Sequence, residues 1–166
     1  MNSSRFAALA AAIITGVVLT SCSGATETER DDDGAVTERN DDASVFDIQL
    51  GDCYNFPSGA TGEVETLTAV PCDEPHEAEA FHESEIEGDE FPGAAEVEKE
   101  AETECVTAFD SFVGLSYEES TLDFTYLTPT QETWDQLDDR LISCLVTDPA
   151  TSEVTGSRAP PADPTT

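Results

Sequence analysis

Four widely spaced cysteines determine which covalent framework this chain can form: Cys53, Cys72, Cys105 and Cys144. In an exported chain an even number of cysteines predicts paired disulfides, and four cysteines allow three pairings. None of the spacings contains the C-x₂₋₄-C pair that zinc sites favour, and only Cys72 and His76 lie close together. We therefore predict two disulfides and no metal site.

A fifth cysteine follows an N-terminal segment with the plan of a secretory signal. Arg5 precedes an apolar run over residues 6–19, shorter than the ~20 apolar residues of a membrane span. The tetrad L-T-S-C ending at Cys22 resembles the lipobox of bacterial lipoproteins, whose cysteine receives a diacylglycerol group. We predict that residues 1–21 are cleaved and that acyl chains such as palmitate on Cys22 anchor the protein to the membrane. A non-lipidated signal peptide and an uncleaved anchor helix are the alternatives.

Composition divides the remaining chain into three parts. Residues 22–44 are strongly acidic and poor in bulky apolar side chains, which predicts a disordered tether. Residues 149–166 are rich in Pro, Ser and Thr, which predicts a disordered tail. The folded domain is expected over residues 45–148. Residues 29–40 resemble a calcium loop, but Asn40 stands where the closing bidentate Glu is required, so we expect no calcium site there.

The chain carries 37 Asp and Glu against 6 Lys and Arg, a formal net charge of −31. This excess repels phosphate backbones, so nucleic acid is not an expected partner. A solvated acidic surface, sometimes an adaptation to salt, is the simplest interpretation, and cation buffering is a sharper one. If the acidic surface binds a partner, we expect that partner to present a basic segment.

Periodicity predicts a small α+β domain with one long helix packed on a small antiparallel sheet. Residues 92–113 repeat apolar side chains three or four apart, which predicts the helix, with Pro92 in its first turn and Gly114 as its C-terminal cap. Expected strands cover residues 45–50, 53–56, 64–70, 78–83, 122–127 and 141–146, with a short helical turn over 130–137.

This layout favours one cysteine pairing. Cys105 lies on the apolar face of the predicted helix and Cys144 lies in an apolar strand, so a bridge from helix to sheet is geometrically natural. Cys53 and Cys72 would then close the first strands. Each bridge could stabilise the fold by ~2 to 4 kcal/mol through restriction of the unfolded chain.

Two strings in the domain, VFDIQLGDCYN from Val45 and VPCDEPHEAE from Val70, are similar to the actinobacterial septum-formation domain family. That resemblance extends to Cys105, to an L-T-P-T segment before Trp134, and to Arg140 ahead of Cys144. The family pattern has Gly where this chain has Asp138, so that turn can be built differently. The resemblance implies an envelope protein linked to septation and wall biogenesis, and it implies no known catalytic mechanism.

Four side chains are candidates for function: His76, Glu79, Trp134 and Arg140. Imidazole titrates near neutral pH and a carboxylate could orient it, so His76 and Glu79 could form a general base. The sequence offers no recognisable nucleophile motif, which favours a structural His76 bonded to backbone in its Pro75 turn. Trp134 is expected in the core, or alternatively on a sugar-stacking face, and Arg140 in a turn with a local ion pair to Asp139.

We therefore predict a non-enzymatic, lipid-anchored adaptor on the extracytoplasmic face of the cell membrane, with no cofactor. Its partner would be an envelope or septal protein or a wall component. One alternative is a cell-wall hydrolase that uses His76 and Glu79. Another is a lipoprotein that binds a cation or a small ligand.

Overall fold

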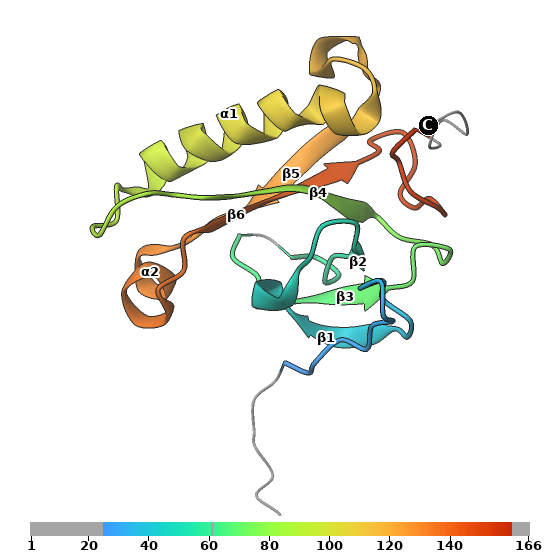
Figure 1. The fold of residues 1–166 in the computed structure, drawn as a ribbon, viewed down its shortest axis with the longest axis horizontal. Coiled ribbons are helices and arrows are strands. Elements are labelled where there is room, and N and C mark those ends of the chain that lie inside the picture. Colours follow the sequence, from blue (N-terminus) through green and yellow to red (C-terminus); the bar gives the residue numbers. More distant parts are fainter. Residues whose placement is uncertain (1–24, 61, 161–166) are drawn as a thin grey trace, which may run out of the picture.

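The computed structural model describes residues 25–60 and 62–160. A six-stranded antiparallel sheet has the order β1-β3-β2-β4-β6-β5, with helix α1 lying across β4, β5 and β6 (Figure 1). The strands are β1 (Asn40–Ser44), β2 (Cys53–Asn55), β3 (Thr66–Val70), β4 (Ala78–Glu85), β5 (Asp123–Leu127) and β6 (Leu141–Thr147). The helices are α1 (Ala94–Val113), α2 (Gln131–Leu137) and the 3₁₀ turns η1 (Val45–Asp47) and η2 (Tyr117–Glu119). The predicted α+β class is confirmed.

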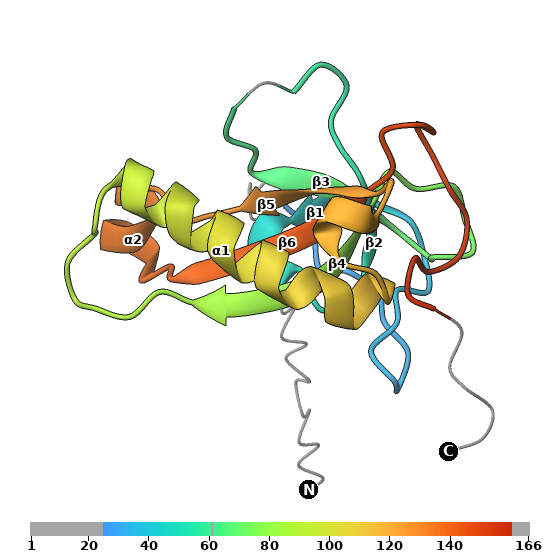
Figure 2. The same ribbon diagram turned by 90° about the horizontal axis from the view of Figure 1, so that it is seen from above.

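The sheet has an apolar cluster on each face. Successive strand residues point to opposite faces, and in β6 Cys144 and Val146 join the cluster beneath α1, whereas Leu145 joins the cluster on the other face. Figure 2 shows α1 running across β6 and β4 over the first cluster. The second cluster is completed by strands β1 to β3, with Leu67 as a fully buried member.

Helix α1 follows from its sequence period. Val97, Ala101, Cys105 and Phe109 are buried at four-residue intervals. The helix begins at Ala94 after Gly93, two residues later than predicted, and Gly114 ends it with a left-handed φ of 81°. The predicted C-terminal cap is therefore confirmed, because glycine adopts this backbone conformation without steric cost.

Two disulfides tie the elements together. Cys53 of β2 pairs with Cys72, which follows β3, with Cα atoms 5.2 Å apart. Cys105 of α1 pairs with Cys144 of β6, with Cα atoms 5.6 Å apart. The bridge from helix to sheet is the pairing that the apolar faces favoured.

The strand predicted over residues 45–50 is wrong. The strand in this part of the chain is β1 (Asn40–Ser44), which ends before the predicted range begins. The chain then turns through η1. The Ser44 hydroxyl accepts a hydrogen bond from the Phe46 amide, so a side chain replaces the sheet as acceptor for this backbone group. Gly51, with a φ of 87°, completes the turn into β2.

Residues 25–44 are folded onto the domain, which corrects the predicted disordered tether in the part that the structure describes. We call the part that precedes β1, residues 25–39, the N-terminal arm. Thr26 bridges to Ala43 of β1, and Val36 is buried in the second cluster. The Arg30 guanidinium makes two bonds of 2.5 and 2.6 Å to the Asp52 carboxylate, which is only 3% exposed. Polar contacts and the buried Val36 side chain together hold this arm on the domain.

Residues 149–160 are also folded, which corrects the predicted disordered tail in its described part. We call this segment the C-terminal arm. Val154 exchanges two backbone hydrogen bonds of 2.9 Å with His76, and the Gly156 amide donates to the Cys72 carbonyl. The folded unit therefore extends beyond residues 45–148 at both ends. The predicted signal peptide, Cys22 and residues 161–166 lie outside the described residues, and no described helix is long and apolar enough to span a membrane.

The Arg30–Asp52 pair gives a test of the N-terminal arm. We expect Arg30→Ala to lower the free energy of unfolding by about 3 kcal/mol, because it leaves a buried carboxylate without its counter-charge. The matched control is Arg39→Ala, whose ion pair with Asp41 is exposed and should contribute less than about 0.5 kcal/mol. Urea unfolding with the disulfides intact would measure both, and equal effects would contradict an ordered arm.

Candidate functional site

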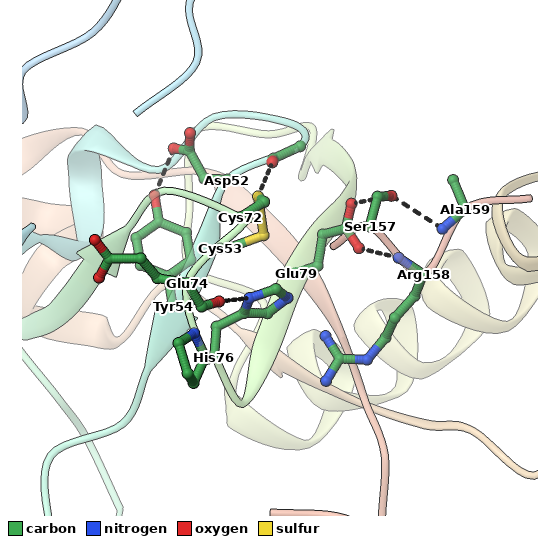
Figure 3. Close-up of a disulfide and its surroundings, with 12 residues drawn as sticks. Asp52, Cys53, Tyr54, Cys72, Glu74, His76, Glu79, Ser157, Arg158 and Ala159 are labelled. Atoms are coloured by element: carbon green, nitrogen blue, oxygen red, sulfur yellow. Dashed lines mark hydrogen bonds between the residues drawn. A yellow bond between two sulfur atoms is a disulfide. The ribbon is translucent and has the colours of Figure 1, made fainter. Parts of the chain in front are cut away.

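His76 is held inside the fold two residues before β4 begins, beside the Cys53–Cys72 disulfide (Figure 3). Its side chain is fully buried, and Nδ1 lies 2.9 Å from the Glu74 carbonyl oxygen. Among the described residues, Nε2 has no hydrogen-bond partner. The backbone contact predicted for His76 is present, and the imidazole is not presented to solvent.

Glu79 is occupied by the C-terminal arm rather than by His76. Its buried carboxylate accepts hydrogen bonds of 2.6 Å from the Ser157 hydroxyl and from the Arg158 amide (Figure 3). The Arg158 guanidinium donates to the Glu77 carbonyl, and desolvation lowers the pKa of Arg158, while Glu79 opposes that shift. In the described structure no hydrogen bond joins His76 to Glu79, so the two candidate residues do not assemble as a general-base pair.

A second buried carboxylate, Asp52, lies next to Cys53 and was not among the sequence candidates. Besides Arg30, it accepts hydrogen bonds from the Tyr54 hydroxyl at 2.5 Å and from the Gln49 amide at 2.9 Å. Burial, reinforced by the Asp52 charge, raises the pKa of Tyr54 well above its usual range, and the hydrogen bond to Asp52 raises the pKa of Arg30. The G-D-C string contains Asp52, but no local signal connects it with Arg30, which lies 22 residues away in a segment of disordered composition.

Trp134 is a buried residue of α2. Thr130 caps this helix through a reciprocal hydrogen bond with Thr133, and the Trp134 indole nitrogen donates to the Asp89 carbonyl at 3.3 Å. The Arg140 guanidinium carbon lies 3.6 Å above the indole ring, which is 2% exposed. The core placement is confirmed, and the sugar-stacking alternative is wrong because Arg140 covers the ring.

The turn after α2 differs from the prediction in one contact. Arg140 pairs with Asp138 at 2.8 Å, whereas the Asp139 carboxylate accepts from the Thr133 hydroxyl and the Leu141 amide. Asp138 is the only described non-glycine residue with a positive φ, 56°. A glycine would suit this left-handed position, in agreement with the glycine that the sequence resemblance implies there.

An open groove of about 750 Å³ runs beside α2. Its walls come from η1, residues 62–65, the start of α1, α2 and the end of β5. The floor is partly apolar, and it contains side chains of Phe91, Tyr126 and Leu127. Carboxylates line the groove and no Lys, Arg or His does so among the described residues. The groove therefore combines an apolar and an acidic lining, which suits an apolar ligand that carries positive charge.

His82, the second histidine, is separate from these features. Its Nε2 lies 3.5 Å from the Glu104 carboxylate on α1. Within residues 25–60 and 62–160 no cluster of three or more His, Cys, Asp or Glu side chains could hold a metal ion. Residues near Asp31 form a small hairpin through the Arg30–Val36 bridge instead of a loop between two helices.

Fold and site define a disulfide-bonded α+β domain with an acidic, partly apolar groove. The family model described as septum formation matches residues 16–160, which include both described arms. The chain belongs to the septum-formation family, and this membership supports a septum-related role in the cell envelope. No match is found among curated proteins or among solved structures.

The left-handed turn at Asp138 gives a test of how this chain departs from the family pattern. We expect Asp138→Gly to raise the free energy of unfolding by about 0.5 kcal/mol, because relief of the left-handed backbone outweighs an exposed ion pair. Asp138→Ala is the control, since it removes the ion pair and keeps the unfavourable backbone. Thermal unfolding that ranks the alanine variant above the glycine variant would contradict this assignment.

Proposed function

We infer that this protein is a lipid-anchored, extracytoplasmic binding domain that serves septum formation or wall assembly without catalysing a reaction. The observation that carries this proposal is the acidic, partly apolar groove beside α2. A groove of this composition can hold a segment of an envelope or septal protein, or a positively charged wall component. Membership of the septum-formation family supports the cellular setting.

The surroundings of His76 support a non-enzymatic role over the hydrolase alternative. Its imidazole is buried, and the Glu79 carboxylate is already bonded to Ser157 and Arg158. A general base must reach the proton that it removes, at about 2.6 to 3.2 Å or through one water. In this structure both side chains hold the C-terminal arm and the adjacent turn instead.

The folded N-terminal arm limits the distance between the domain and its proposed lipid anchor. If Cys22 carries the lipid, only the links from Cys22 to Ala25 separate the anchor from the described chain. Three residues span at most about 11 Å when fully extended. We therefore propose that the domain is held close to the membrane surface rather than at the end of a long tether.

Crosslinking in dividing cells tests the proposed function. We expect the full-length protein to be recovered with septal or wall-synthesis proteins and to be enriched at the septum. The non-lipidated Cys22→Ala variant should lose both, because it is no longer concentrated at the membrane. Uniform membrane distribution of the wild type without a reproducible partner, measured by microscopy and mass spectrometry, would contradict the proposal.

Partner recovery by a His76 variant, together with an assay for wall-fragment release, distinguishes binding from catalysis. His76→Gln should keep at least half of the recovered partner once unfolding measurements show that the variant is folded. A hydrolase that used His76 as its base would instead lose about 10² to 10⁴-fold of its turnover. Wall-fragment release by the wild-type protein that disappears in His76→Gln would support the hydrolase alternative and contradict our proposal.

A further inference from the structure

We propose that the groove and the free edge of β5 together bind an extended, basic and aliphatic peptide segment of a partner protein, which adds to the sheet as a strand beside β5. This proposal rests on the proposed function and specifies the chemistry of the partner. In strand addition, backbone hydrogen bonds contribute affinity and side-chain pockets contribute specificity.

The two edge strands of the sheet, β1 and β5, differ in whether another segment covers them. At one edge, β1 is covered by the N-terminal arm: Thr26 bridges to Ala43 and its amide donates to the Asp42 carbonyl at 2.9 Å. The pairing of β1 with β3 is also irregular between Asn40 and Ala43. Coverage and irregularity are the ways in which proteins protect an edge strand from pairing.

The other edge lacks this protection in the described structure. β5 pairs with β6 through five registered positions, and no other described strand pairs with it. Its sequence DFTYL contains a single charge, at Asp123, and three large apolar or aromatic side chains. An uncovered strand of this composition can accept a strand from another chain.

The groove begins where β5 ends, so side chains of the added strand can bind in the groove. Tyr126 and Leu127, the last residues of β5, line it, as does Val64. Two exposed apolar side chains also lie on its walls: Phe46 is 49% exposed and Leu137 is 60% exposed. Aliphatic side chains of a bound strand would cover apolar surface that is now in contact with water.

Charge determines which peptide fits. Glu63, Glu65, Glu98, Glu132 and Asp139 line the groove, without a described cation among them. A basic segment would be attracted, whereas a second copy of this chain, with a formal charge of −31, would be repelled. The observations therefore favour a basic partner segment over self-association.

The test uses full-length protein in non-ionic detergent and a labelled synthetic peptide of alternating Lys and Val. Fluorescence anisotropy should show binding that weakens as salt increases, since charge attraction is screened. An alternating Glu and Val peptide should not bind. Hydrogen exchange of the complex should slow at the β5 amides and stay unchanged at β1.

Matched variants locate the binding site. Phe46→Ser and Leu137→Ser remove apolar groove side chains, and each should weaken peptide binding by about tenfold. Leu50→Ser and Leu115→Ser are the controls, because these side chains are similarly exposed, at 59% and 52%, and lie outside the groove. All four positions are exposed, so the variants should remain folded, which urea unfolding would check.

Equal losses in all four variants, unchanged exchange at β5 or equal binding of the acidic peptide would each overturn the inference. None of these results would overturn the proposed function, which depends on partner recovery and septal position in cells. Conversely, if the wild-type protein binds the peptide but is not enriched at the septum, the proposed function alone is contradicted.

Discussion

Two buried carboxylates organise this fold, because an ionised group inside a protein requires donors that compensate for lost water. Asp52 immediately precedes β2 and Glu79 lies on the neighbouring strand β4, and the Asp52 carbonyl accepts a hydrogen bond from the Ala80 amide at 2.8 Å. The N-terminal arm supplies Arg30 to Asp52, and the C-terminal arm supplies donors from Ser157 and Arg158 to Glu79. Each arm therefore supplies hydrogen-bond donors to one buried carboxylate, in addition to its other contacts.

The same arms define which surfaces remain open. The N-terminal arm covers the β1 edge, and the C-terminal arm bonds to the backbone of His76. β5 and the groove beside α2 are left uncovered among the described residues. The chain has few cations, and Arg30, Arg140 and Arg158 make internal contacts. The described groove is lined by carboxylates without a cation, which supports the proposal of a basic partner.

His76 and Trp134 show that a residue type often found in active or binding sites can also have a packing role. His76 and the Cys53–Cys72 disulfide fasten the turn that precedes β4, and the arm pairs with the His76 backbone. Trp134 is covered by Arg140, and the indole nitrogen bonds to a distant carbonyl. Both residues belong to the segments that resemble the septum-formation family, and in this structure both are buried and contribute to packing.

Local pattern alone was sufficient for the features that depend on neighbouring residues: the four-residue period of α1, the Gly114 cap, most strands and the bridge from helix to sheet. The arms could not be predicted in this way, because their composition resembles that of disordered chains and their stabilising partners are distant in sequence. Arg30 and Asp52 are 22 residues apart, and Ser157 and Glu79 are 78 residues apart, so no local pattern connects either pair. The groove likewise exists only once η1, α2 and β5 are brought together, so the tertiary structure decided where a partner could bind.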